Sequence, residues 1–394
     1  MRRGAPLLGG GAVAVAVLAA IAACGGGGTT LTEDSGSDAA WSWSLPANFP
    51  APKVPADNPM SAAKVELGRF LFYDPRLSGN GEQSCGSCHL QALAFTDGRA
   101  HAVGSTGEDH PRAAQHLANV VYNATLTWAN PSLVTLERQM ETPLFGERPV
   151  EMGVNDRNKA AVLERLRTDT GVAGYPARFA AVFAGEAEPL RWSNVIKAIA
   201  AFERTLISGN SRYDQWLAGK ATLSAAELRG MKLFFGEKAE CFHCHGSFNF
   251  NDQIVHAGSR VVETPFHNTG LYNIGGTGAY PEDNRGVFEL TAKAADMGAF
   301  RAPSLRNVEV TAPYMHDGSI STLAEVVATY AAGGRHIASG PHAGDGRTNP
   351  YKDGLISRID LDGVEQADIV AFLRTLTDTD FLTDARHADP FAKN

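Results

Sequence analysis

Two short segments of this 394-residue chain carry cysteine and histidine at the same spacing. Residues 85–89 and 241–245 each read Cys-x-x-Cys-His, which is the attachment motif of c-type haem. The two thiols, one helical turn apart, bind the haem vinyl groups, and the adjacent histidine ligates the iron. A zinc site would need four convergent ligands, and a thioredoxin-like site would need a βαβ context that the sequence lacks. The motifs predict two covalently bound haem c groups, held by Cys85, Cys88, His89, Cys241, Cys244 and His245.

Composition restricts the remaining possibilities. Hydrophobic residues make up 44% of the chain and charged residues 20%, as in ordinary globular proteins. The net charge of -8 argues against a nucleic acid as the partner. Four of the five cysteines belong to the two motifs, and the fifth is Cys24, so no structural disulfide is expected.

The N-terminus is typical of an exported protein. Arg2 and Arg3 precede an apolar run over residues 7–23, which predicts a signal peptide over residues 1–23. Cleavage before Cys24 would leave a lipid-modified cysteine, followed by a flexible tether and extended arm over residues 24–57. The alternative is ordinary cleavage nearby. We expect a periplasmic protein that is lipid-anchored to a bacterial membrane.

The elements that must position the motifs are mainly α-helical. Apolar residues recur at helical spacing after Ser193, and Ser224 and Thr322 begin capping-box patterns. Long glycine-rich loops are expected over residues 270–286 and 333–346.

A repeat divides the chain into two parts. A Gly-x-x-Leu-Phe pattern at residues 68–72 and again at 230–234 precedes each Cys-x-x-Cys-His motif. The pattern predicts a duplicated unit, with domains at residues 58–208 and 209–394.

Several further stretches resemble the bacterial di-haem cytochrome c peroxidase and MauG superfamily, and among its members MbnH and related MauG-like lipoproteins. They are residues 71–78, 95–98, 126–131, 143–147, 149–153, 267–272, 302–307 and 311–318. The resemblance implies two cytochrome c-like domains, a peroxide-reactive haem in the first and an electron-transfer haem in the second.

The resemblance also implies the ligand that opposes His245. Peroxidases of the superfamily place a methionine on the helix after the Pro-Tyr-x-His-Asp-Gly loop, whereas MauG-like members place a tyrosine there. Tyr330 stands at this position, and a phenolate stabilises oxidised iron. The alternative is that Met315 ligates the iron and Tyr330 is a core aromatic. Trp128 matches the tryptophan between the two haems, although a lone tryptophan is often only packing.

Around the first haem, Gln139 and Glu151 match the distal glutamine and glutamate, and Glu151 would move a proton. Their interval is two residues longer than in the family, which keeps Glu147 as an alternative. We interpret His110 as a surface loop histidine rather than a resting iron ligand.

A calcium ion is implied between the haems. Thr311 and Pro313 match the positions that supply carbonyl ligands, but Ala113 replaces the expected asparagine.

The expected function follows from the resemblance. It is an enzyme that uses hydrogen peroxide, through a charge-shared bis-Fe(IV) state, to oxidise a tryptophan of a secreted copper-binding partner to kynurenine. The alternatives are a cytochrome c peroxidase with small electron donors and a non-catalytic di-haem electron carrier.

Overall fold

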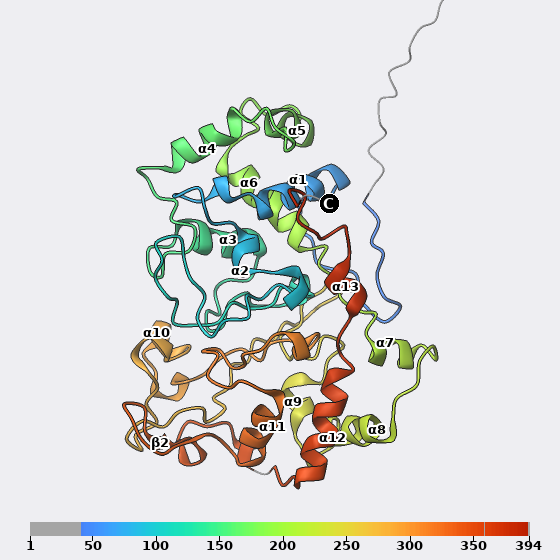
Figure 1. Cartoon of the computed structure of the whole chain (residues 1–394), viewed down its shortest axis with the longest axis vertical. Helices are drawn as coiled ribbons and strands as arrows, with labels where there is room; N and C mark the ends of the chain where they lie inside the picture. Colours follow the sequence, from blue (N-terminus) through green and yellow to red (C-terminus); the bar gives the residue numbers. More distant parts are fainter. Residues whose placement is uncertain (1–40, 358, 393–394) are drawn as a thin grey trace, which may run out of the picture. The chain divides into compact units, whose positions relative to one another are not determined.

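The computed structural model describes residues 41–357 and 359–392 (Figure 1). The predicted signal peptide, Cys24 and most of the predicted tether lie outside these residues. The described chain is mainly helical, which confirms the predicted fold class. None of its helices is long and apolar enough to cross a bilayer.

The helices fall into two runs along the chain. The first run comprises α1 (Ala62–Tyr73), α2 (Cys85–Cys88), α3 (Leu136–Phe145), α4 (Lys159–Arg167), α5 (Tyr175–Val182) and α6 (Trp192–Glu203). The second comprises α7 (Arg212–Leu217), α8 (Ala225–Phe234), α9 (Cys241–His245), α10 (Phe288–Thr291), α11 (Leu323–Ala331), α12 (Gly363–Arg374) and α13 (Thr379–Thr383). Two short antiparallel strands, β1 (His336–Ile337) and β2 (Gly344–Asp345), lie in the second glycine-rich loop region.

Both predicted capping boxes mark a helix start, whereas the apolar pattern after Ser193 places the start of α6 slightly too late. Ser224 caps α8 and Thr322 caps α11, each in a reciprocal capping box with the glutamate three residues later. α6 begins before Ser193, because Arg191 occupies its N-cap position without a side-chain hydrogen bond. A serine near a helix start therefore does not by itself mark the cap.

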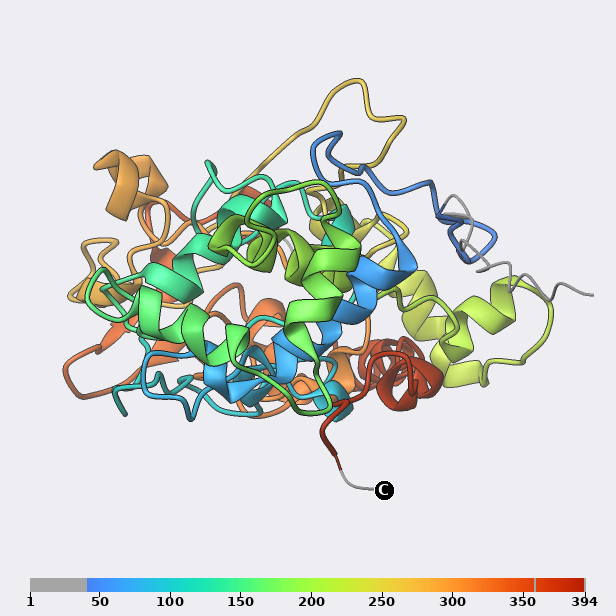
Figure 2. The ribbon, with the colours of Figure 1, turned by 90° about the horizontal axis from the view of Figure 1, so that it is seen from above.

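The repeated glycine lies at the same kind of helix crossing in both runs. α1 packs against α6, and α8 packs against α12 (Figures 1 and 2). A Cβ on Gly68 would lie 1.9 Å from the carbonyl oxygen of Ala198, and one on Gly230 would lie 1.8 Å from that of Asp368. Because a Cβ cannot come so close to a backbone atom, only glycine lets each helix pair approach this far.

Each helix pair carries its own apolar core. One core surrounds α1 and α6 and includes Phe72 and Phe202, and another surrounds α8 and α12 and includes Phe234 and Phe372. The C-terminal segment then returns to the first core, where Phe381 of α13 is buried. The division at residues 208 and 209 stays a prediction.

Two buried asparagines tie the segments together near that division. Asn119 and Asn307 both have a left-handed backbone, with φ of 60° and 61°, and each precedes a short 3₁₀ helix. The Asn119 amide donates to the Ser208 carbonyl at 2.8 Å, and the Asn307 amide donates to Ser208 Oγ at 2.9 Å. The two asparagines thus have matching positions in the duplicated pattern and share Ser208.

We expect Gly68→Ala and Gly230→Ala each to destabilise the haem-loaded protein by about 1–3 kcal/mol, the usual cost of overpacking. The matched control is Gly354→Ala, where an added Cβ meets nothing within 4 Å. Denaturant unfolding would check this, and equal stability of all three variants would contradict the role given to the crossings.

Candidate haem-binding site

The first attachment motif forms the short helix α2 and the turn after it. Ser84 and Ser87 make a reciprocal capping box at its start, and His89 ends it. His89 Nδ1 lies 2.7 Å from the carbonyl oxygen of Phe95. A ring nitrogen held in this way sets the tautomer and leaves Nε2 to bind iron.

The second motif repeats the arrangement. α9 carries Cys241 and Cys244, and His245 Nδ1 lies 2.8 Å from the carbonyl oxygen of Phe250. Phe95 and Phe250 both have positive φ, 66° and 54°. Burial lowers the pKa of both motif histidines, which keeps them neutral, the form that binds metal.

The four motif cysteines are free thiols in the described structure. Burial raises the pKa of Cys88 to about 11 and that of Cys241 to about 12. An uncharged sulfur suits these apolar surroundings, and the sulfur of a thioether bond carries no charge.

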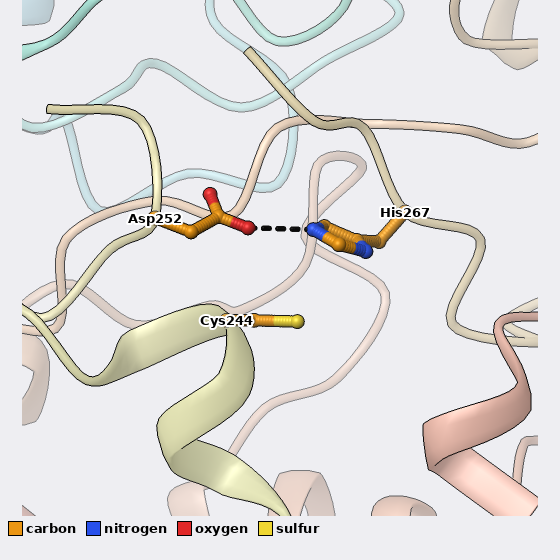
Figure 3. A group of neighbouring side chains, drawn as sticks. All are labelled: Cys244, Asp252 and His267. Carbon is orange, nitrogen blue, oxygen red and sulfur yellow. Dashed lines mark hydrogen bonds and ion pairs between the residues drawn. The ribbon is translucent and has the colours of Figure 1, made fainter. Parts of the chain in front are cut away.

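A charged triad borders the second motif. His267 Nε2 lies 2.6 Å from Asp252 Oδ2, and Nδ1 lies 2.7 Å from Asp353 Oδ2. Burial opposes a charge on the ring, but Asp252, the Cys244 sulfur and Asp353 together outweigh it and raise the pKa of His267 to about 11. Figure 3 shows the Cys244 thiol beside the His267–Asp252 pair. The three could hold a metal, but the haem motif already requires the Cys244 sulfur.

A large, mainly apolar cavity adjoins the second motif and brings the two halves of the chain together. Cys241, Cys244, His245 and Tyr330 line it from the second half, and Trp128 and residues 113–116 line it from the first. Met315, Thr311 and Pro313 also border it. Most of the site residues predicted for the second haem therefore face one space.

Three buried nitrogen atoms in this cavity wall have no hydrogen-bond partner. They belong to Arg301, His116 and His316. Arg301 is 4% exposed, donates to Gln115 and to the Thr127 carbonyl, and pairs with no carboxylate among the described residues. Its pKa falls to about 10, because burial disfavours an uncompensated charge.

These unpartnered nitrogens, the Arg301 donor above all, fit a haem, which carries two carboxylates. A buried guanidinium without an anion is costly, and a bound carboxylate would remove that cost. The apolar wall, the free histidine Nε2 atoms and the spaced thiols match the remaining parts of the same cofactor. The residues present therefore fit haem c at the second motif.

Around the first motif, Glu151 is half-buried, and desolvation raises its pKa to about 7. Its charge acts on both Cys85 and Cys88, so it lies near the thiols of this motif. Glu147 is exposed, and Gln139 is half-buried on α3. Within the described residues no hydrogen bond joins Gln139 to Glu151.

His110 is not the surface histidine that we expected. It is 8% exposed, and its Nε2 lies 3.4 Å from the carbonyl oxygen of Val150, next to Glu151. The loop of residues 101–110 folds back on itself, which buries a residue whose polar neighbours in sequence predicted exposure.

Trp128 and Tyr330 line the same cavity, Trp128 from the first half of the chain and Tyr330 from the second. Trp128 Nε1 donates to the carbonyl of Ala113 at 2.9 Å, and its ring lies 6.5 Å from that of His316. Tyr330 lies on α11, where burial raises its phenol pKa. Met315 has a left-handed backbone and packs with the Trp128 cluster.

The residues of the predicted calcium site also meet at the cavity. Thr311, Pro313 and Ala113 all line it. The Ala113 amide donates to the His316 carbonyl, and its side chain offers no ligand. An ion there would depend on backbone oxygens.

Sequence reasoning missed the buried Arg301 guanidinium and the charged triad. Arg301 directly precedes the recognised stretch at residues 302–307, and His267 lies inside another. Asp252 and Asp353 stand 101 positions apart, and no local pattern joins them to His267.

Replacing Cys241 and Cys244 together with alanine should leave one covalently bound haem, and replacing Cys85 and Cys88 should do the same. The number of covalently bound haems can be measured with the pyridine haemochrome assay after acid–acetone extraction, which removes haem that is not covalently bound. Two retained haems in either variant would contradict the assignment of that motif.

Comparison with known proteins agrees with this site. The model of the family described as di-haem cytochrome c peroxidase matches residues 62–222. The cytochrome-c peroxidase IdrP1 of Denitromonas iodatirespirans is 37% identical over 374 residues, covering 90% of this chain and 92% of that protein. The methylamine utilization protein MauG of Methylorubrum extorquens is 33% identical over 332 residues, covering 84% and 82%.

A crystal structure of a MauG-like protein associated with microbial copper homeostasis is also similar. It superposes with a TM-score of 0.88 at 57% sequence identity and covers 90% of this chain and 100% of that chain. With the fold, the two attachment motifs and relatives along nearly the whole length, the chain belongs to the di-haem cytochrome c peroxidase and MauG family of haem-dependent oxidoreductases, a family that implies two haem c groups.

Proposed function

We propose that this enzyme uses hydrogen peroxide to oxidise a tryptophan of a secreted, copper-binding partner protein, with kynurenine as the product. The observation that carries the proposal is Tyr330, which lines the cavity with Cys241, Cys244 and His245. A phenol oxygen opposite His245 favours oxidised iron, whereas a thioether favours reduced iron. The similarity to a MauG-like protein associated with copper homeostasis supports the class of partner.

When bound, the two haems supply the two-electron chemistry of peroxide reduction and hold the oxidising equivalents. The chain's own residues then control protons and charge. Glu151, with a pKa of about 7, can accept a proton from peroxide and return it to the departing oxygen. Gln139 would complete the pocket by hydrogen bonding to peroxide.

Trp128 would carry charge between the two haems. Its indole is fixed by the bond to the Ala113 carbonyl, and its ring borders the cavity of the second motif. A macromolecular substrate cannot enter this buried site, so the oxidising equivalents have to reach the partner through the protein. A rigid aromatic side chain between the halves suits such transfer.

A cytochrome c peroxidase activity is the second candidate. IdrP1, a cytochrome-c peroxidase, is similar over nearly the whole chain, and Met315 borders the same cavity as Tyr330. If Met315 held the second iron, the enzyme would begin its cycle reduced and use small electron donors.

We propose a periplasmic location with a lipid anchor on Cys24, domains at residues 58–208 and 209–394, and a calcium ion on the Thr311 and Pro313 carbonyls. Calcium chelation would test the last of these through loss of the peroxide reaction and its recovery on adding calcium.

The reaction with peroxide should speed up as pH rises through about 7. Glu151 is protonated below its pKa and becomes a carboxylate above it, and only the carboxylate accepts the first proton. Glu151→Gln should slow the reaction by about 10²–10⁴-fold and abolish the rise. Stopped-flow measurement of the rate between pH 5 and 9 would show this, with Glu147→Gln as the matched control. If the pH dependence of the rate were unchanged in Glu151→Gln, another group would have to accept the proton.

The fully ferric enzyme should react with peroxide without prior reduction and then oxidise a protein tryptophan. Tyr330→Met should lose this reaction and keep both haems, because the thioether favours the reduced state. Trp128→Phe should slow it, and Tyr351→Phe is the control. Mass spectrometry of the partner and haem spectra would measure both. A ferric enzyme that stays inert until one haem is reduced would favour the peroxidase candidate.

A further inference from the structure

Three side chains with metal-binding atoms meet at the start of α9, two from the segment that joins α8 to α9 and one from α9 itself. They are Glu237, Glu240 and His243. His243 Nε2 lies 2.8 Å from Glu240 Oε2 and 4.0 Å from Glu237 Oε2. All three ligand atoms lie within 4.8 Å of one another. The proposed function gives none of these side chains a role.

Glu240 is the buried member of the group, and its Oε2 has His243 as its ion-pair partner. Its side chain is only 11% exposed, and its Oε2 is buried without a hydrogen-bond partner. The contact with His243 is close, but it lacks the geometry of a hydrogen bond. Burying a carboxylate oxygen without a hydrogen bond destabilises the fold unless a nearby cation compensates its charge.

The other two members leave the group open to solvent. His243 is 35% exposed, and Glu237 is 84% exposed. The centroids of the Phe242 and His243 rings lie 4.1 Å apart. This contact holds the imidazole over one face of the Phe242 ring. An ion can therefore enter from outside and meet a partly fixed imidazole and a buried carboxylate.

We propose that Glu237, Glu240 and His243 form a site for one divalent metal ion of the first transition row or Zn²⁺. One imidazole with two carboxylates suits these borderline ions. Bonds of about 2.0–2.2 Å place neighbouring ligand atoms of a tetrahedral site about 3.3–3.6 Å apart. His243 Nε2 lies 2.8 Å from Glu240 Oε2, which is closer than that range, and 4.0 Å from Glu237 Oε2, which is farther. Both carboxylates would therefore have to shift when an ion binds. Calcium does not fit, because it takes six to eight oxygen ligands.

The site is separate from the haem iron, although Glu240 also lines the haem cavity. Its histidine lies inside the second Cys-x-x-Cys-His motif, between the two thiols, whereas His245 is the motif's iron ligand. The competing explanation is a simple His243–Glu240 ion pair on the protein surface, which would bind no ion.

The proposal can be tested by titrating the haem-loaded full chain with Zn²⁺ in a calorimeter, which measures the number of bound ions and their affinity. We expect one ion per chain at this site, and binding at least tenfold weaker in Glu237→Gln, Glu240→Gln and His243→Gln. His342→Gln and Glu282→Gln are the matched controls, because both replace exposed residues outside the group. They should bind Zn²⁺ as the unaltered protein does.

Haem content has to be measured in each variant, because His243 lies within an attachment motif. Glu237→Gln leaves that motif intact and keeps the test valid if His243→Gln fails to mature. Absence of Zn²⁺ binding in the unaltered protein would overturn the proposal. Binding of equal strength in Glu237→Gln and Glu240→Gln would overturn it as well.

Discussion

The second half of this protein is built around a buried positive charge that the chain itself does not neutralise. Arg301 lies in the cavity wall with one nitrogen unpartnered, and His116 and His316 add two more orphaned nitrogens. A folded chain normally pairs such a group, because an isolated buried charge is strongly disfavoured. Here the partner has to be a ligand. The apolar wall, the thiols and the free histidine nitrogen nearby identify it as an anionic cofactor with apolar faces.

Both halves hold the motif histidine in the same way. A phenylalanine with left-handed backbone turns its carbonyl toward histidine Nδ1, at Phe95 for His89 and at Phe250 for His245. The bond fixes the ring and leaves Nε2 to bind iron. The strained backbone is supported by burial of both phenylalanine rings in the apolar cores.

Helix packing places these sites on a duplicated frame. Gly68 and Gly230 permit the close crossings of α1 with α6 and of α8 with α12, and the attachment helices α2 and α9 follow α1 and α8 along the chain. The halves are not independent at their edges, since the C-terminal segment packs on the first core and Ser208 bonds both buried asparagines. A shared cavity wall is consistent with charge passing between the halves.

What the sequence determined by itself was local. The Cys-x-x-Cys-His spacing and the capping boxes at Ser224 and Thr322 each act within one or two helical turns, so they can be recognised without a structure. The repeated glycine could be recognised as a repeat, but not the helix crossings that it permits. Tertiary structure decided what depends on distant segments. It buried His110 against Val150, joined Asp252 and Asp353 to His267, and left Arg301 without a carboxylate. The physical reason is that burial and charge pairing depend on which chain segments meet, and sequence spacing carries no information about that.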